Sequence, residues 1–116
     1  MLVGLRKHWK YPIGYVLSNK IDADNLSCLI SKALHLSFEH KIKVRAVTMD
    51  GTSVNFRAMK LLGCNIGTTS DNLDGLFTFD DNDVYFFPDP PHMLKLARNA
   101  LHDYQIFVDG EGNKIK

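Results

Sequence analysis

Two aspartates follow hydrophobic runs that are typical of buried strands. Asp50 comes directly after the run 43–49, and Asp89 comes directly after the run 84–88. A carboxylate at the C-terminal end of a buried strand, just before a helix, is where α/β folds often place their chemistry. If the two strands are parallel neighbours, both carboxylates emerge at one sheet edge. There they could bind divalent cations for phosphodiester chemistry. The alternative is that each Asp holds the backbone N–H groups of a turn or helix cap.

The residues after Asp89 carry a second polar group at helical spacing. His92, Lys95 and Asn99 fall on one helix face, with Arg98 beside them. This face could hold a phosphate or orient the Asp89 region. The alternative is an ordinary solvated face, with His92 bonding locally. On the opposite side we expect apolar residues to pack: Met93, Leu94, Ala97, Ala100 and Leu101.

The elements that would position these residues follow from periodicity and from capping and turn residues. We expect strands at 1–6 and 11–18 forming an antiparallel hairpin, a helix at 22–40, a strand at 43–49 and a helix at 53–62. A polar surface loop at 64–83 with a short strand at 76–79 follows, then a strand at 84–87, a helix from Pro90 or Pro91 to about 102, and the start of another element at 106–116. The order predicts an α/β fold in which helices cover a mixed sheet.

Local signals support the helices. Asp22 or Asp24 can cap the first helix, and an apolar stripe gives it a core-facing side: Leu26, Leu29, Ile30, Ala33 and Leu34. Thr52 or Ser53 can cap the second, and Gly63 is a stop signal. The acidic run Asp80–Asp83 does not have the spacing of an EF-hand loop, and we expect it in a solvated loop.

The turn of the expected N-terminal hairpin is basic and aromatic. Arg6, Lys7, Trp9 and Lys10 combine cations with a ring that can stack on a base, which makes this turn a candidate nucleic-acid contact. Residues 1–60 carry ten Lys and Arg against four Asp and Glu, whereas residues 61–116 carry four against nine. The basic half could face a polyanion, although such asymmetry is also compatible with ordinary solvated surface.

Composition excludes several classes of protein. The hydrophobic content of 45% argues against disorder, and the apolar runs are far shorter than the roughly 18 residues of a membrane helix. The N-terminal order of apolar and charged residues is the reverse of a secretory signal. Cys28 and Cys64 form no C-x-x-C pair, so we expect buried, reduced thiols and not a zinc site.

Three stretches, in order and together spanning nearly the whole chain, closely resemble the P-element transposase family and its THAP-domain relatives in animals. They are Val3–Tyr15, Val47–Thr52 and Val84–Asn99. The resemblance implies an RNase H-like domain that cuts and joins DNA with three acidic residues and Mg²⁺. It makes Asp50 the second acid. It places Asp89, His92, Lys95, Arg98 and Asn99 in a family motif of uncertain role, with Asp89 a further candidate metal ligand.

The chain also departs from the family pattern. The family's first acid lies on an earlier strand, usually within Asp-Glu-Met, and its last acid lies beyond a GTP-binding insertion. Neither is present here, nor is the zinc-binding THAP domain, and Met49 and Pro91 stand where Cys is expected. We therefore expect residues 1–116 to be a partial RNase H-like domain without a GTP site.

The resemblance implies a nuclear protein with DNA, specifically transposon ends, as partner, and self-association or binding to a full-length transposase. It implies no membrane partner. Because the acid set is incomplete, we expect no catalysis by this chain alone. The alternative is a domesticated, non-catalytic DNA- or protein-binding module. A third expectation is an exposed hydrophobic sheet edge that favours aggregation. Whether the chain is a truncated gene product, a relic or a domesticated protein stays open at this point.

Overall fold

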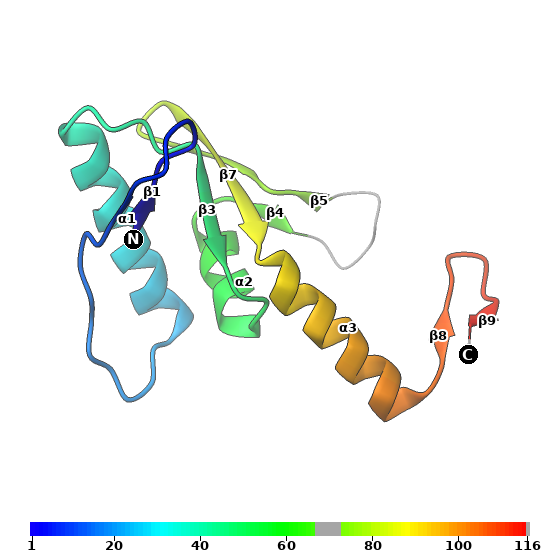
Figure 1. Cartoon of the computed structure of the whole chain (residues 1–116). Coiled ribbons are helices and arrows are strands. Elements are labelled where there is room, and N and C mark those ends of the chain that lie inside the picture. The colour runs from blue at the N-terminus through cyan, green and yellow to red at the C-terminus, as the bar shows by residue number, and fades with distance from the viewer. Residues whose placement is uncertain (67–72, 116) are drawn as a thin grey trace.

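The computed structural model describes residues 1–66 and 73–115 (Figure 1). Three helices are present: α1 Ala23–Glu39, α2 Ser53–Leu61 and α3 Pro90–Tyr104. The strands are β1 Leu2–Val3, β2 Lys10–Tyr11, β3 Ala46–Met49, β4 Asn65–Ile66, β5 Leu73–Asp74, β6 Leu76–Phe79, β7 Asn82–Pro88, β8 Phe107–Val108 and β9 Lys114–Ile115. Within these residues, no helix combines the length and hydropathy needed to cross a membrane.

The central sheet has three strands in the order β3-β7-β6. β3 pairs with β7 in parallel, and β6 pairs with β7 in antiparallel orientation. β7 is therefore the middle strand, and two of its side chains, Val84 and Phe86, are fully or almost fully buried. The mixed sheet with flanking helices confirms the predicted α/β class.

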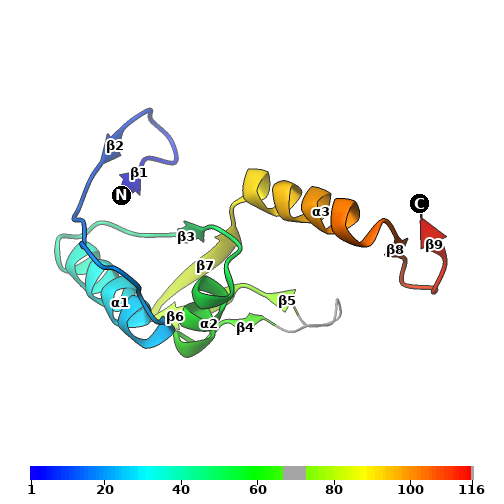
Figure 2. The ribbon, with the colours of Figure 1, turned by 90° about the horizontal axis from the view of Figure 1, so that it is seen from below.

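Helices α1 and α2 cover one face of this sheet, as Figure 2 shows. The core between them consists of buried residues from both helices and the sheet: Leu34, Met59, Cys64, Phe77, Val84 and Phe86. The ring of Phe56 on α2 meets the ring of Phe86 edge-on, with centroids 5.8 Å apart. Such a pair adds about 0.5–1.5 kcal/mol beyond the area it buries. The core thus fixes β7, and with it β3, against the helices.

The N-terminal hairpin is present but shorter than predicted. Only β1 and β2 pair, with Val3 opposite Lys10, and they form a sheet of their own instead of joining the central one. The prediction of a strand over 11–18 is wrong beyond Tyr11. Pro12 cannot donate to a ladder, and Tyr15 and Leu17 are 89% and 91% exposed with no neighbouring strand among the described residues.

The first two helices begin and end close to the predicted residues. Asp22 caps α1, and its side chain accepts a hydrogen bond from the Asn25 N–H at 2.7 Å. Thr52 is the N-cap residue of α2 but makes no cap bond with its side chain. Gly63 follows α2 with φ +105°, a conformation that side chains other than glycine's rarely allow. The capping and stop signals were therefore correct.

The predicted apolar stripe of α1 is only partly in the core. Leu34 is buried, whereas the other four members are half-buried beneath the N-terminal segment. Cys64 is buried as predicted, but Cys28 is exposed on α1, so the expectation of two buried thiols was wrong for Cys28. Cys28 lies between the stripe positions Leu26 and Leu29 along the chain.

The described residues of the region 64–83 form more strands than the single short strand expected there. β4 pairs with β5 on either side of residues 67–72, which lie outside the described part, and β6 forms at the predicted residues 76–79. Asp80 and Asp81 have φ of +46° and +58° and form the two-residue turn between β6 and β7. Two left-handed residues give the backbone twist that a tight hairpin requires. The acidic run is thus a hairpin turn leading into β7.

Helix α3 forms where predicted but does not pack as predicted. It runs away from the sheet, and none of its residues is buried (Figure 1). The expected apolar side is largely solvent-exposed, with Leu94 73% and Leu101 38% exposed. The expectation that this side packs was wrong for most of the helix, because among the described residues only the Asp50 turn, through Gly51, lies close to it, at Met93. The following residues form the β8–β9 hairpin, which lies within the range 106–116 where the start of another element was expected.

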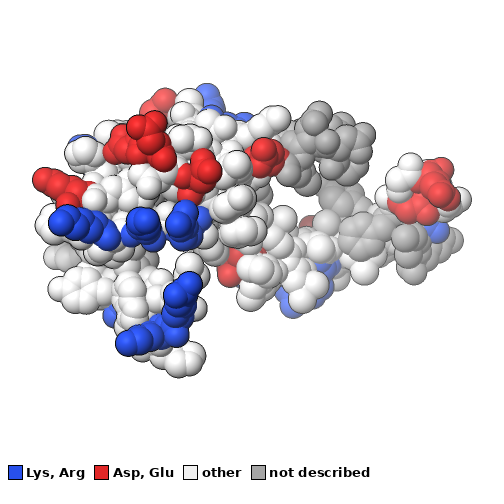
Figure 3. Space-filling view, turned by 90° about the horizontal axis from the view of Figure 1, so that it is seen from above, with Lys and Arg blue, Asp and Glu red and all other residues white. Residues whose placement is uncertain are grey.

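The charges are unevenly distributed over the surface. Figure 3 looks onto the end of the molecule that carries the β1–β2 turn, the α1–β3 connection and the β6–β7 turn. Lys and Arg side chains form a row across this end with a further group below it, and acidic side chains lie directly above the row. Basic side chains therefore gather on this end of the molecule, next to acidic ones.

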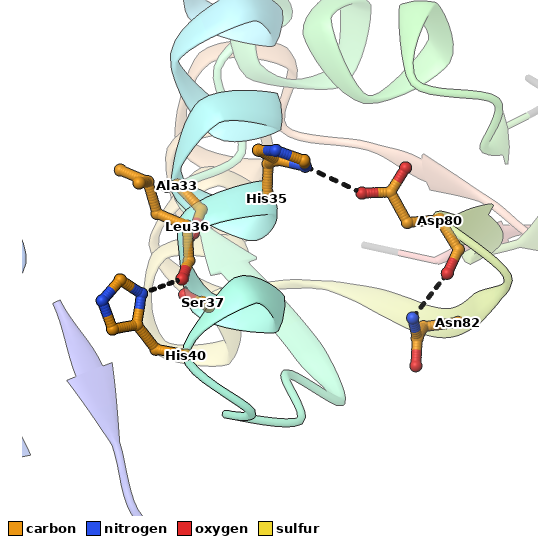
Figure 4. A network of polar contacts seen from close by, with 7 residues as sticks. All are labelled: Ala33, His35, Leu36, Ser37, His40, Asp80 and Asn82. Atoms are coloured by element: carbon orange, nitrogen blue, oxygen red, sulfur yellow. Dashed lines mark hydrogen bonds and ion pairs between the residues drawn. The ribbon is translucent and has the colours of Figure 1, made fainter.

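Polar contacts tie the end of α1 to the β6–β7 turn (Figure 4). His35 Nδ1 lies 3.1 Å from Asp80 Oδ2, and Asn82 Nδ2 donates to the Asp80 carbonyl oxygen at 2.6 Å. His40 Nδ1 donates to the Leu36 carbonyl oxygen at 2.8 Å and closes the last turn of α1. The His35 and Asp80 side chains are 69% and 52% exposed, so their pairing contributes at most about 1 kcal/mol.

Candidate active site at the ends of two strands

The parallel pairing of β3 and β7 brings Asp50 and Asp89 to the same sheet edge. Met49 lies opposite Pro88 in the register, and the Asp89 N–H donates to the Met49 carbonyl oxygen at 2.8 Å. Each Asp is the next residue after its strand, and neighbouring strands lie about 4.8 Å apart. The two backbones therefore leave the sheet side by side.

The Asp50 side chain is exposed but oriented by its neighbours. Asn55, on the first turn of α2, donates from Nδ2 to the Asp50 carboxylate through Oδ1, and also to its carbonyl oxygen at 3.2 Å. The Thr52 N–H also donates to Asp50 Oδ1, at 3.3 Å. Oδ1 accepts both of these hydrogen bonds. Asp50 thus organises the strand-to-helix turn while its carboxylate stays accessible from solvent.

Asp89 is the N-cap of α3. Its Oδ2 accepts a hydrogen bond from the His92 N–H at 3.3 Å, and the residue is half-buried. A carboxylate at this position is also favoured by the positive end of the helix dipole. The capping alternative therefore describes Asp89 in this structure. A cap and a metal ligand use different lone pairs, so the capping bond does not by itself exclude ligation.

His92 connects the two strand ends. Its Nδ1 accepts a hydrogen bond from the Gly51 N–H at 3.2 Å, which assigns the ring proton to Nε2. Gly51 also lies so close to α3 that a Cβ there would fall 2.7 Å from Met93 Sδ and 2.9 Å from Leu96 Cδ1. The absence of a side chain at Gly51 thus lets the first turns of α3 approach the Asp50 turn.

The sequence did not reveal the partners of Asp50 and His92. Asn55 was treated as part of the second helix, and His92 was expected to bond locally or face a phosphate. The signal that could have found Asn55 is the short Asp-Gly-Thr turn, because a helix that begins directly after this turn places Asn55 on its first turn, close to Asp50.

The rest of the polar group on α3 does not converge on this site. Arg98 Nη2 donates to Asn99 Oδ1 at 3.1 Å, and Lys95 is exposed. Among the hydrogen bonds of the described residues, none joins Lys95, Arg98 or Asn99 to either aspartate. Only His92 of the predicted motif meets the turn that carries Asp50.

The chemistry of the donors fits Mg²⁺ in part. Mg²⁺ binds hard oxygens, and its sites often use one or two carboxylates with water and phosphate oxygens as the other ligands. Asp50 offers an accessible carboxylate, and Asp89 leaves the sheet beside it. Within residues 1–66 and 73–115, no three His, Cys, Asp or Glu side chains cluster closely enough to form a metal site. Asp50 fits as one ligand of such an ion, with Asp89 as a second candidate.

The candidate nucleic-acid contact lies elsewhere. Arg6, Lys7, Trp9 and Lys10 belong to the β1–β2 turn and the start of β2, which lie near the beginning of β3, whereas Asp50 lies beyond its other end (Figure 1). The Trp9 N–H donates to the Lys7 carbonyl oxygen at 2.9 Å, and the Trp9 side chain is 45% exposed. The basic turn and the strand-end aspartates are thus two separate regions.

Comparisons with known proteins agree on one class. A family model described as TNP-like, RNase H N-terminal domain matches residues 1–63. The human protein DNA transposase THAP9 is 31% identical over 117 residues, which cover 95% of this chain and 12% of that protein. The Transposable element P transposase of Drosophila melanogaster is 27% identical over 111 residues, which cover 93% of this chain and 13% of that protein. No solved structure matches. The chain spans only about an eighth of the length of these relatives.

Proposed function

This chain belongs to the P-element transposase family, and we propose that it forms part of an RNase H-like domain that cuts and joins DNA, with Asp50 as one of its metal-binding carboxylates. DNA is the general substrate class of such transposases. The specific substrates that we propose are the ends of a transposable element, in the nucleus. Self-association or binding to a longer transposase is the corresponding proposal for protein partners.

One observation carries the proposal: the parallel β3–β7 register that brings the Asp50 and Asp89 backbones out of the sheet side by side. A catalytic carboxylate must be held in one position by a rigid element. β3 supplies that element, because β7 beside it is anchored in the core by Val84 and Phe86. This rigid position at a strand end supports the proposal that Asp50 takes part in metal-assisted phosphodiester chemistry.

The residues around Asp50 would prepare it for this role. Asn55 and the Thr52 N–H both donate to Oδ1, which holds the carboxylate and leaves Oδ2 without a hydrogen bond among the described residues. His92 holds the Gly51 N–H and so ties the Asp50 turn to α3. When bound, Mg²⁺ would polarise the phosphodiester and stabilise the leaving oxygen. Asp50, and secondarily Asp89, would hold it.

We propose that this chain does not cleave DNA by itself. The described residues offer at most two neighbouring carboxylates, and two-metal catalysis needs more. The purified chain, incubated with supercoiled plasmid and Mg²⁺ or Mn²⁺, should nick no faster than its Asp50→Asn variant. Nicking that depends on Asp50 would contradict this part of the proposal.

The role of Asp50 is tested in a larger protein. Residues 1–116 would replace the aligned segment of the human relative, and transposition of a marked element would be counted for the chimera and its Asp50→Asn variant. We expect the substitution to abolish transposition at equal protein level, while Asp103→Asn, on the exposed end of α3, should have little effect. Equal transposition frequencies for the chimera and its Asp50→Asn variant would refute the catalytic role of Asp50.

A second candidate function is a non-catalytic DNA-binding module. It is supported by the β1–β2 turn, where the half-exposed Trp9 ring lies among Arg6, Lys7 and Lys10. Aromatic rings that stack on bases, together with cations that pair with phosphates, bind single-stranded nucleic acid without sequence preference. This candidate needs neither Asp50 nor a metal.

A further inference from the structure

The side chain of Asn55 directs its amide nitrogen at a single residue. Nδ2 donates to the Asp50 carboxylate through Oδ1 and to the Asp50 carbonyl oxygen at 3.2 Å. Both partners only accept, so the reverse orientation of the amide would place its oxygen against two other oxygens. Asn55 lies on the first turn of α2, which the fully buried Ala58 and Met59 anchor in the core. The donor therefore reaches Asp50 from a rigid element.

The two carboxylate oxygens of Asp50 have different surroundings. Oδ1 accepts the Thr52 N–H at 3.3 Å in addition to Asn55. An ionised carboxylate has about four lone-pair sites on its two oxygens, so two donors fill the usual capacity of Oδ1. Oδ2 has no hydrogen-bond partner among the described residues, and Asp50 is exposed. A cation can therefore bind Oδ2 without displacing a donor, whereas binding to Oδ1 requires a hydrogen bond to break.

Asp89, the second candidate ligand, has the same arrangement. Its Oδ2 accepts the His92 N–H at 3.3 Å, and its Oδ1 has no hydrogen-bond partner within residues 1–66 and 73–115. Each of the two carboxylates thus offers one oxygen without a hydrogen bond. The donors differ, because a backbone N–H holds Asp89, whereas a side chain holds Asp50. Asn55 is therefore the residue whose replacement changes the number of oxygens that the site offers.

Mg²⁺ and Ca²⁺ bind carboxylates in different ways. Mg²⁺ keeps several waters and takes one or two carboxylates in a strict octahedral arrangement. Ca²⁺ takes about six to eight oxygens and often binds both oxygens of one carboxylate. One oxygen from each carboxylate is sufficient for Mg²⁺, with water and phosphate as its other ligands. The same set leaves Ca²⁺ with too few protein oxygens.

We propose that Asn55 makes this site selective for Mg²⁺ over Ca²⁺ by occupying Oδ1 of Asp50, which restricts this carboxylate to ligation through one oxygen. The inference rests on the proposed function, because it requires Asp50 to be a metal ligand. Asn55 itself binds neither the metal nor DNA, and it acts through Asp50 as a positioning residue. Selection against the larger ion matters because Ca²⁺ accepts flexible ligand geometry, which is poorly suited to hold a phosphodiester for in-line displacement.

Metal competition on the intact chain tests the proposal. Mn²⁺ is added until the Gly51 and Thr52 amide signals broaden, and NMR then gives the concentrations of Mg²⁺ and of Ca²⁺ that restore half of each signal. The ratio of these concentrations measures selectivity without any cleavage of DNA. In Asn55→Ala the ratio should shift toward Ca²⁺ by about tenfold, because a hydrogen bond to a charged oxygen no longer has to break before that oxygen binds Ca²⁺.

A matched control lies on α1. Asn25 Nδ2 donates to Asp22 Oδ2 at 3.0 Å, so Asn25→Ala removes the same kind of hydrogen bond at the start of another helix. This variant should leave the ratio unchanged. The ratio also separates positioning from a merely structural role of Asn55. A loosened turn would weaken the binding of Mg²⁺ and Ca²⁺ alike and would not change their ratio.

A second measurement uses the unaltered chain and so does not depend on the folding of a variant. The two Nδ2 protons of Asn55 give separate NMR signals, and their hydrogen bonds to Asp50 slow their exchange with solvent. Excess Mg²⁺ should leave both signals and their slow exchange in place, because it binds through Oδ2.

Three outcomes would overturn the inference. The first is an unchanged ratio in Asn55→Ala while Mn²⁺ broadening still depends on Asp50, and this outcome leaves the proposed function intact. The second is fast exchange of the Asn55 amide protons in excess Mg²⁺, which would show that the ion displaces Asn55 from Oδ1. The third is broadening that persists unchanged in Asp50→Asn, which would refute the metal-binding role of Asp50 together with this inference.

Discussion

The Asp89 N–H donates to the Met49 carbonyl oxygen at 2.8 Å, and this bond ends the parallel ladder between β3 and β7. Beyond this bond the two segments diverge: one continues into the Asp50 turn and α2, and the other continues into α3. A second hydrogen bond joins the two segments again, because the Gly51 N–H donates to His92 Nδ1 at 3.2 Å. Two hydrogen bonds across the strand ends thus fix the geometry of the candidate active site.

Replacing His92 tests how much this geometry depends on the second bond. His92→Ala removes the acceptor of the Gly51 N–H, which should lower the free energy of unfolding by about 1 kcal/mol and speed exchange of the Gly51 amide about fivefold. His92→Asn places an oxygen near the position of Nδ1 and should restore most of the protection. Unchanged Gly51 exchange in the Ala variant would show that this bond does not hold the turn.

Cys64 should make stability depend on alkaline pH. Burial raises the pKa of its thiol from 9.0 to about 11, and the charge of Asp74 adds to the increase. Between these values the folded chain holds the proton more tightly than the unfolded chain. The stabilisation is therefore complete below about pH 9 and is lost as pH rises toward 11, by about 2 kcal/mol.

Urea unfolding at about pH 8 and about pH 11 measures this effect against a Cys64→Ala control. The loss of stability should be smaller in the Ala variant by about 2 kcal/mol, because Lys and Tyr titrate alike in both proteins. Alkylation offers a second check, since the exposed Cys28 should react much faster than Cys64. Identical pH dependence in both proteins would refute the buried-thiol account.

The β1–β2 turn should bind single-stranded DNA through separable charge and stacking contributions. Lys7→Ala and Lys10→Ala should each reduce the slope of log affinity against log salt by about 0.7. Trp9→Ala should weaken binding by about 1–3 kcal/mol without changing that slope. Lys95→Ala on α3 serves as the control for charge loss. The proposal that the β1–β2 turn binds DNA would be refuted if the chain did not bind single-stranded DNA at low salt. It would also be refuted if Lys95→Ala weakened binding as much as Lys7→Ala or Lys10→Ala.

Local chemistry made most of the fold predictable. Asp22 caps α1, and Gly63 ends the α2 region in a left-handed conformation, because these signals act over only a few residues. The hydrophobic runs before Asp50 and Asp89 became parallel neighbours because a strand, a helix and a second strand form a crossover unit. Because the two strands are parallel, Asp50 and Asp89, which follow them, lie at the same edge of the sheet.

What could not be predicted depends on partners far along the chain. Among the described residues, 12–18 have a strand-like sequence but lack a neighbouring strand, and the apolar side of α3 stays largely exposed beyond the contact of Met93 with Gly51. Asp80 and Asp81 resembled a loop because Asp only occasionally adopts the left-handed conformation of a tight turn. The His92–Gly51 bond spans 41 residues, a separation at which spacing carries no information.

The central claim is that Asp50 binds a divalent cation at the end of β3, and Mn²⁺ titration followed by NMR tests it most directly. Paramagnetic broadening should appear first at the amides of Gly51 and Thr52, and it should be absent in Asp50→Asn. In Asp89→Asn the same amides should still broaden, but only at a higher Mn²⁺ concentration. Excess Mg²⁺ should reverse it by competition. Broadening that is the same in Asp50→Asn, or that appears first at Asp80 and Asp81, would contradict the account.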